Sequence, residues 1–491
     1  MTNIRRELMV IGGKEVKSAS GKWMQVENPS KKGEIVAEVP RANDEDVDMA
    51  VNVAEEAFKT WKEVPIAQRG AILLKIADAI EEAAAELGEM VATENGNAIR
   101  YTLGEAKNAG EKIRYYGGLA SEVKGTVYPG PKDAFLYTRR EPLGVVAAIT
   151  PWNSPLALAA VKIGPALLTG NTVVLKPAST APVSVINMVK IANKFLPAGV
   201  LNIITGSGSE CGMALAKHPK VKKITFTGST EVGKQLLQLA ADRVVMSTME
   251  LGGKNPQIVC PDSYQDYVVN GVIGTVRFNR MGQSCSSGSR IYIHKSIFDS
   301  FVDKMVKKLK TYKLGNALSE DTDIGPIVNR QQFTKVYSYI EAALKEKKAT
   351  LMCGGLPPEE GPLAEGYYIE PTVFVSPDDS TVLAKEEIFG PVVVAIPWDD
   401  EQEVLRMAND TAYGLVAYIW CHDAVKAMNM AHSVNAGSIM INYWGPPTEG
   451  HPYGGMKESG IGRENCLEGI LGNYTEMKAV TLNMDYPPKG E

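Results

Sequence analysis

The sequence is poor in features that would place it in a specialised class of protein. It has only five histidines among 491 residues, without ligand spacing, and none of its six cysteines forms a C-x-x-C pair. A zinc site or a disulfide framework is therefore not expected. There is no dense basic block and the net charge is −5. Neither a nucleic acid nor a membrane surface is favoured as a partner.

Long apolar runs are also missing. The most apolar region, residues 155–175, is interrupted by lysine, proline, glycine and asparagine too often for a segment that crosses a bilayer. The first residues, MTNIRRELMVIGG, lack the apolar core of a secretory signal. We therefore expect a soluble cytoplasmic protein. Its length exceeds one ordinary core, so two or three domains are expected.

What the chain does contain is an alternation of short apolar runs and amphipathic segments. Residues 44–62 predict a helix because their apolar side chains share one face, and residues 66–94 predict one or two more. From residue 145, the runs VVAAI, TVVLK, LNIIT and KITFT are each followed by a helical pattern. This alternation is typical of βαβ units around a parallel sheet, where ligands bind at the carboxyl ends of the strands.

Further strand patterns follow. A second alternating region from 257 to about 450 predicts a second α/β domain. Residues 121–140 and the tail MKAVTLNMDY both have strand character. We expect residues 121–140 to form a projecting hairpin, and the tail to pair with it or with another subunit.

Cys285 is the first candidate for chemistry, because it lies in RMGQSCSSGSR with no bulky apolar neighbour in the sequence. A structural cysteine usually packs as a small hydrophobic residue. Gly282 and Gly288 allow tight turns that aim N–H groups at the sulfur or at an adjacent oxyanion. This pattern favours a nucleophile, with an inert loop cysteine as the alternative.

Other residues after strands could act with Cys285. Glu250, in MELGGKNP, could take a proton from water, or could simply face solvent. Asn153, in ITPWNSP, could donate to an oxyanion, or could be a turn residue between two prolines. The segment FTGSTEVG could hold a pyrophosphate at a helix N-terminus, whereas ITGSGSECG has the spacing G-x-G-x-x-x-G. A conventional Rossmann fingerprint is therefore not supported.

Taken in chain order, a series of segments resembles those of the aldehyde dehydrogenase superfamily: PWNSP, KIGPALLTGNTVVLKPAS, LPAGVLNIITG, FTGSTEVG, MELGGKNP, GQSC, EEIFGPV, AYGL and YGGMKESGIGRE. The resemblance runs over almost the whole chain. It implies a Rossmann-like NAD(P)-binding domain with a parallel sheet over residues 1–119 and 143–252, and a second α/β, catalytic domain over 253–455. It also implies a small β oligomerisation element, hairpin 120–142 and tail 470–491, and a homodimer or homotetramer.

By this resemblance, Cys285 attacks the aldehyde to give a thiohemiacetal, and Asn153 with the Cys285 N–H forms the oxyanion hole. Hydride passes to the nicotinamide, and Glu250 then activates the water that releases the acid from a thioester. Lys162 and Glu464 match positions of a proton path away from Glu250. The cofactor residues that it implies are Thr150, Trp152, Lys176, Ser179, Gly228, Ser229, Gly233, Leu251, Glu387 and Phe389.

One departure from the family pattern concerns the choice of cofactor. Many NAD-preferring members have a glutamate three residues after the lysine of the KP motif, where this chain has Ser179. A glutamate can bind the ribose 2′-OH and repel a 2′-phosphate. Serine removes that repulsion, which predicts that NADP is accepted, alone or alongside NAD.

The implied substrate channel suggests the size of the aldehyde. Several of its residues are smaller than the aromatic residues common in acetaldehyde-type members, which favours an aromatic or medium-chain aldehyde. The three aromatic residues could stack on a substrate ring, or could only pack the wall. A semialdehyde such as succinic semialdehyde, with Arg280 as its carboxylate partner, is the alternative. The residues expected in the channel are Ser154, Ala157, Leu158, Val161, Arg280, Ser284, Tyr443, Trp444 and Tyr453.

Two other functions are open on the same scaffold. In a CoA-acylating relative, CoA takes the acyl group in place of water, but such enzymes generally lack the glutamate that matches Glu250. A binding protein without catalysis would be expected to lose the nucleophile or the base, and this chain has both. No metal is expected at the site.

Overall fold

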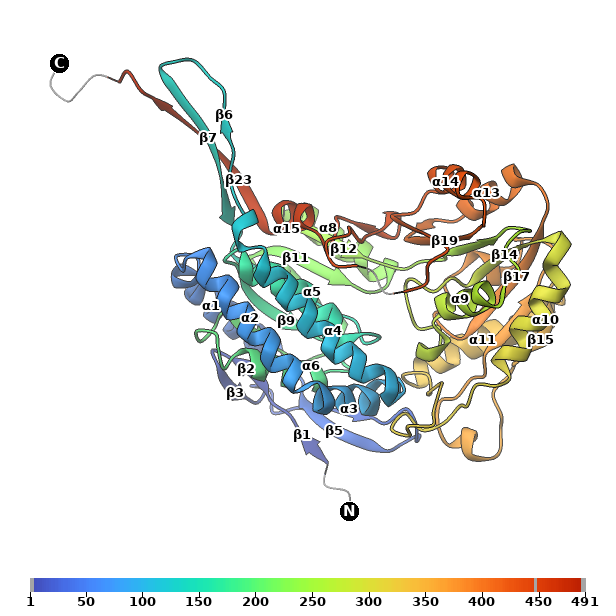
Figure 1. The fold of residues 1–491 in the computed structure, drawn as a ribbon. Helices are drawn as coiled ribbons and strands as arrows, with labels where there is room; N and C mark the ends of the chain where they lie inside the picture. The colour runs from blue at the N-terminus through green and yellow to red at the C-terminus, as the bar shows by residue number, and fades with distance from the viewer. Residues whose placement is uncertain (1–3, 446–447, 487–491) are drawn as a thin grey trace.

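The computed structural model describes residues 4–445 and 448–486. Two large sheets with helices packed around them form the two halves of the molecule, and a narrow three-stranded sheet projects from one half (Figure 1). This is the α/β architecture that the alternating pattern predicts. No helix in the described part of the chain has the length and apolarity needed to span a bilayer.

The first large sheet has the strand order β22-β12-β11-β8-β9-β10-β2-β3, and its five central strands are parallel. Their residues are almost all buried, as expected where helices cover both faces of a parallel sheet. β2 and β3 on one edge and β22 on the other pair in the antiparallel direction. They were not predicted, because each is only two or three residues long. The bounds are β8 Val145–Ile149, β9 Thr172–Lys176, β10 Leu201–Ile203, β11 Val221–Thr227, β12 Met246–Glu250, β2 Met9–Ile11, β3 Lys14–Val16 and β22 Gly460–Ile461.

The helices of this half confirm most of the helical pattern. The predicted helix at 44–62 is α1, whose N-cap Asn43 forms a capping box with Asp46. The segment 66–94 forms two helices, α2 and α3. The next helix, α4, was not predicted, since its four glycines lower helix propensity. The bounds are α1 Asp44–Trp61, α2 Ile66–Glu82, α3 Ala84–Asn95, α4 Ile99–Gly118, α5 Pro155–Leu168, α6 Val183–Ala192, α7 Met213–Lys217 and α8 Thr230–Arg243.

Two of the four glycines in α4, Gly110 and Gly117, are explained by how closely this helix packs on α2. A Cβ atom on Gly117 would lie 3.0 Å from the carbonyl oxygen of Gly70, and one on Gly70 would lie 2.7 Å from that of Gly117. The two backbones therefore approach at a point where only glycine fits. Tertiary packing outweighs the local preference here.

The second large sheet has the order β15-β16-β17-β14-β13-β19-β20, parallel except for the edge strand β15. It confirms the second α/β region. The bounds are β13 Pro256–Val259, β14 Arg290–His294, β15 Thr350–Cys353, β16 Thr372–Val375, β17 Val392–Trp398, β19 Val416–Trp420 and β20 Ser438–Ile441. Its helices are α9 Asp266–Val276, α10 Phe298–Leu309, α11 Arg330–Glu346, α12 Val382–Lys385, α13 Glu401–Asn409 and α14 Ala424–Ser433.

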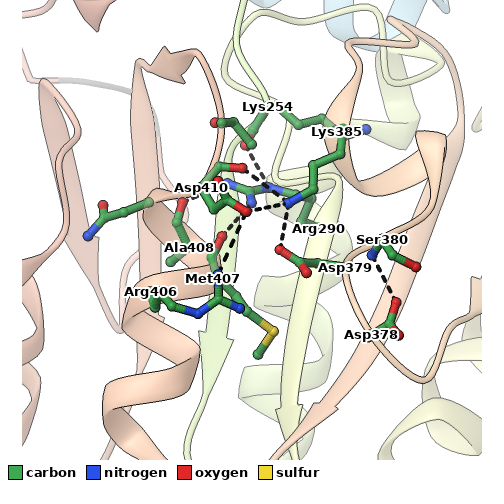
Figure 2. A network of polar contacts seen from close by, with 12 residues as sticks. Lys254, Arg290, Asp378, Asp379, Ser380, Lys385, Arg406, Met407, Ala408 and Asp410 are labelled. Carbon is green, nitrogen blue, oxygen red and sulfur yellow. Dashed lines mark hydrogen bonds and ion pairs between the residues drawn. The ribbon is translucent and has the colours of Figure 1, made fainter.

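A buried arginine fixes the short connection between the two sheets. β12 ends at Glu250 and β13 begins at Pro256. Arg290 is 1% exposed and donates to the main-chain carbonyls of Lys254 (2.9 Å), Met407 (2.9 Å) and Ala408 (2.8 Å) (Figure 2). The last two belong to the C-terminal turn of α13, where carbonyls lack the usual partner four residues on, although that of Met407 also accepts from the N–H of Asp410 at 3.2 Å. The guanidinium thus adds donors at the end of this helix and ties the connection to α13.

The projecting sheet consists of β6 (Val127–Tyr128), β7 (Ala134–Pro142) and β23 (Thr475–Asn483), in the order β23-β7-β6. β23 follows α15 (Leu467–Tyr474) and runs antiparallel to β7 along its whole length. The strand-like tail therefore pairs with the hairpin of its own chain (Figure 1).

Candidate active site

The carboxyl ends of the parallel strands bring several predicted residues to one edge of the first sheet. Ile149 pairs with Lys176, and Thr227 pairs with Glu250, so β8, β9, β11 and β12 all end there. Asn153 lies in the loop between β8 and α5. An edge of this kind is where an open α/β sheet binds ligands.

A cavity of about 440 Å³ contains both the predicted nucleophile and the predicted base. Cys285, Glu250 and Asn153 all line it, and so does Glu464. Seven of the predicted channel residues line it as well: Ser154, Ala157, Leu158, Val161, Arg280, Ser284 and Tyr453.

Tyr443 and Trp444 lie elsewhere. They line a second hollow, of about 570 Å³, which shares Tyr101, Arg277 and Asn279 with the first. The ring of Trp444 packs on the main chain of α9, where a Cβ atom on Gly274 would lie 2.5 Å from it. The structure therefore does not bring these two aromatic residues into the cavity of Cys285.

Cys285 packs against more side chains than its small sequence neighbours suggest. It is half-buried against a cluster of Leu415, Val416 and Tyr418. Asn255 donates to the carbonyl of Cys285 at 2.7 Å. Burial raises the pKa of the Cys285 thiol to about 11. The bulky apolar side chains that pack on Cys285 come from and beside β19, far along the chain, and not from its sequence neighbours.

Asn153 is buried, in the bend between β8 and α5. Its side-chain amide donates to the carbonyl of Gln283 at 3.0 Å. Its own carbonyl accepts from Asn97 at 3.3 Å. The amide is thus fixed against the turn that precedes Cys285, with one N–H left to donate into the cavity.

Glu250 is 4% exposed, and neither carboxylate oxygen accepts a hydrogen bond from a described residue. Burial raises its pKa well above the usual value, and the charge of Glu464 raises it further, whereas Lys162 and Arg463 lower it. A Cβ atom on Gly454 would lie 2.9 Å from Oε1 of Glu250. A carboxylate in this setting can receive a proton at neutral pH, as a general base must.

Lys162 and Glu464 form a buried ion pair beside Glu250. The Nζ of Lys162 is 2.9 Å from Oε1 of Glu464, and the two side chains are 0% and 4% exposed. Lys162 also donates to Thr225 at 3.2 Å. Their charges act on the pKa of Glu250, and the proton path expected through them stays a prediction.

The predicted phosphate and ribose residues lie at the strand ends. Lys176 is buried, its ammonium donates no hydrogen bond to a described residue, and burial lowers its pKa. Thr150 also has a buried hydroxyl without a partner among the described residues. Ser229 is exposed and caps α8, accepting from Val232 at 3.4 Å. Ser179 is half-buried in the turn after β9.

The residues predicted to lie near the nicotinamide are on or close to the connection between the two sheets. Glu387 accepts from the N–H of Gly253 at 2.8 Å. The rings of Trp152 and Phe389 meet edge to face, with centroids 5.4 Å apart. Gly233 and Leu251 pack together, since a Cβ atom on Gly233 would lie 2.5 Å from Cδ2 of Leu251. These two residues are therefore in contact, and their predicted role in cofactor binding stays a prediction. Gly228 donates its N–H to the carbonyl of Glu250 at 3.0 Å.

A sequence model for the aldehyde dehydrogenase family matches residues 16–480. The chain belongs to this family.

Individual relatives agree with that assignment. The Bacillus subtilis protein DhaS, which carries an aldehyde dehydrogenase name, is 41% identical over 481 residues, covering 97% of this chain and 96% of that protein. The NAD⁺ complex of an aldehyde dehydrogenase from Bacillus cereus has 38% identity and a TM-score of 0.94, covering 98% and 97% of the two chains. PnpE in complex with nicotinamide adenine dinucleotide has 36% identity and a TM-score of 0.95, covering 98% of each chain.

The aldehyde dehydrogenase fold also places a carboxylate in the cavity that was not predicted. Glu105, on α4, lies 4.0 Å from the guanidinium of Arg280 and accepts the N–H of Leu156 at 3.2 Å. Burial raises the pKa of Glu105. Arg280 in turn donates to Ser154, beside Asn153. No local signal marks Glu105, because its role depends on α4 packing against the start of α5.

Two structural cysteines lie together away from this cavity. Cys260, Asp262 and Cys421 place one possible ligand atom each within 4.8 Å of the others. The carboxylate of Asp262 accepts the N–H groups of His422 and Asp423, both at 3.1 Å. These bonds give Asp262 a role in the local turn. The absence of a metal from the mechanism stays a prediction.

Proposed function

We propose that this aldehyde dehydrogenase oxidises an aldehyde to the carboxylic acid through an acyl group held on Cys285 and released by water. The observation that supports this most is the shared cavity of Cys285, Glu250 and Asn153. A nucleophile, an oxyanion donor and a base that face one space are the parts needed for acyl transfer to water.

Each residue then has a defined step. The Cys285 sulfur forms a bond to the aldehyde carbon, and the developing oxyanion accepts the free N–H of Asn153 and the N–H of Cys285. A nicotinamide held at this site would supply the acceptor for the hydride that leaves this carbon. Glu250 takes a proton from water as the water oxygen bonds to the acyl carbon and the carbon–sulfur bond breaks. Lys162 and Glu464 set the pKa of Glu250, and we assign them the path that returns its proton to solvent.

The cofactor is NAD or NADP, as the residues at the strand ends support. Lys176 would hold the adenosine ribose, since its buried ammonium has no partner among the described residues. Ser229 and the N-terminus of α8 would hold the pyrophosphate. Glu387 would hold the nicotinamide ribose. Ser179 in place of a glutamate leaves room for a 2′-phosphate, and this supports the acceptance of NADP.

The cavity walls favour an aromatic or medium-chain aldehyde. Gly104, Ser154 and Ala157 leave space, and Leu158 and Val161 add apolar surface. A cavity of about 440 Å³ is within the range that accommodates a small organic ligand. The semialdehyde alternative is less well supported, because a substrate carboxylate bound by Arg280 would also face Glu105, 4.0 Å from that guanidinium.

We also propose the domain assignment and the assembly that the family resemblance implies. Residues 1–119 and 143–252 would bind the cofactor, and residues 253–455 would carry the nucleophile. The projecting sheet of β6, β7 and β23 has an exposed edge and exposed apolar residues such as Val127, Phe135 and Leu482. These features support a homodimer or homotetramer that is joined through this sheet. A cytoplasmic location is proposed separately, from the sequence.

Glu250→Gln tests the proposed hydrolytic step. The variant is expected to give a burst of reduced cofactor followed by no turnover, because acylation proceeds and deacylation stops. Cys285→Ala should abolish both phases. The measurement is absorbance of the reduced nicotinamide with aliphatic, aromatic and carboxylated aldehydes. Unchanged steady-state turnover in either variant would refute the assigned role.

A further inference from the structure

Tyr453 contacts the nucleophile directly. Its Oη lies 3.6 Å from Sγ of Cys285, within hydrogen-bond distance for sulfur, and either atom could be the donor. Tyr453 packs with Cys285 on the apolar cluster of Leu415, Val416 and Tyr418. The phenol is therefore a neighbour of the reacting atom as well as a part of the cavity wall.

The position of Tyr453 is fixed from both sides. Its N–H donates to the carbonyl of Glu464 at 3.0 Å, and the N–H of Glu464 donates back at 2.7 Å. Glu464 is itself held by Lys162. The next residue, Gly454, has φ of 158° and lies against the carboxylate of Glu250. Residues 453 and 454 therefore place a hydroxyl beside Cys285 and main chain beside Glu250, the base that acts on the same acyl group.

Only one direction of this hydrogen bond is chemically useful. A thiolate has no proton to donate, so once Cys285 is ionised the phenol must be the donor. Burial raises the pKa of Tyr453 well above its usual value, and the charges of Cys285 and Glu250 raise it further. The phenol thus keeps its proton at a pH at which the thiol has lost its own. The hydrogen bond from Tyr453 lowers the pKa of Cys285, against the effect of burial.

We propose that Tyr453 is a catalytic residue whose hydroxyl donates a hydrogen bond to the Cys285 thiolate. The bond stabilises the nucleophile before attack. It stabilises the same sulfur again when the carbon–sulfur bond breaks and the electron pair returns to it during hydrolysis. This inference rests on the proposed role of Cys285 and gives Tyr453 a function other than stacking on a substrate ring.

Tyr453→Phe removes the hydroxyl and keeps the ring. The test is the rate of Cys285 alkylation by iodoacetamide as a function of pH, in the full-length protein without aldehyde or cofactor. The rate in Cys285→Ala is subtracted as the contribution of the other cysteines. The expected result is a displacement of the profile to higher pH, with a rate about ten-fold lower at neutral pH, because a hydrogen bond to a charged group is lost. Tyr453→Met, which also lacks a donor, should show the same displacement if the ring itself is unimportant to folding.

Tyr418→Phe is the matched control. Its hydroxyl belongs to the same apolar cluster but donates to the carbonyl of Ser286 at 2.8 Å, and not to the sulfur. Its alkylation profile should keep the wild-type midpoint. Coincident profiles for Tyr453→Phe and the wild type would overturn the inference.

This readout separates the inference from the proposed function. If the wild type oxidises aldehydes but the alkylation profile of Tyr453→Phe is unchanged, only the role of Tyr453 fails. If the profile moves but the wild type oxidises no aldehyde of the panel, the hydrogen bond to the thiolate stands and the proposed function fails.

Discussion

The buried ion pair of Lys162 and Glu464 leads to a prediction that tests both stability and mechanism. The two charged atoms are 2.9 Å apart and the side chains are 0% and 4% exposed. Lys162→Met leaves Glu464 charged, buried and unpaired beside Glu250. Breaking one partner of a buried pair costs about 3–5 kcal/mol. We expect a loss of that size in the free energy of unfolding, measured by urea denaturation.

Two further variants show whether the loss comes from the unpaired charge. The double variant Lys162→Met with Glu464→Gln removes both charges and should recover most of the lost stability. Lys295→Met breaks an exposed pair with Asp399, in which the side chains are 57% and 61% exposed. It should cost less than about 1 kcal/mol. A Lys162→Met variant as stable as Lys295→Met would refute the reasoning.

The pH dependence of turnover gives the second measurement. Lys162 lowers the pKa of Glu250 and Glu464 raises it. The base is active when deprotonated, so the rate rises as the pH passes its pKa. Lys162→Met should therefore move the acidic limb of the kcat profile to higher pH, and Glu464→Gln should move it to lower pH. Displacements in the same direction would show that the pair only supports the fold.

Two other predictions concern the cofactor and the loop of the nucleophile. Ser179→Glu should raise the KM for NADP by ~10-fold or more and leave the KM for NAD close to the wild-type value, because a carboxylate repels the 2′-phosphate; equal effects on both cofactors in steady-state kinetics would contradict this. Asn255→Ala removes an amide that donates to the carbonyls of Cys285 (2.7 Å) and Ser287 (2.8 Å) and accepts from Val416 (2.9 Å). It should lower stability by about 2–4 kcal/mol and lower kcat, since buried polar groups lose their partners; a variant with wild-type kcat would show that this amide does not position Cys285.

Local sequence patterns predicted the helices and strands whose apolar residues recur with a regular period. The helix at 44–62 follows from its apolar face, and four of the five parallel strands follow from the apolar runs VVAAI, TVVLK, LNIIT and KITFT. Elements with weak local signals were not found. The edge strands at 9–11 and 460–461 are very short, and only the packing of α4 on α2 explains Gly110 and Gly117.

The residues of the candidate site also divide into those that the sequence predicted and those that it did not. Cys285, Glu250 and Asn153 could be selected from their motifs, because each follows a strand or a glycine turn at which ligands bind. Tyr443 and Trp444 were placed in the channel by resemblance, and the structure puts them in the adjacent hollow. Glu105 gave no signal, since an acid on a helix is usually exposed and this one is buried against Arg280.

The sequence by itself determined the class of fold, the family resemblance and the kinds of residue available for acyl transfer, because these depend on order and periodicity along the chain. Only the tertiary structure decided which side chains share a cavity with Cys285, and that Tyr453 lies against its sulfur. Residues 285 and 453 are far apart in the chain, and no local preference specifies a contact between them. That contact, and the surroundings that set the pKa of Cys285 and Glu250, exist only when the two sheets pack together.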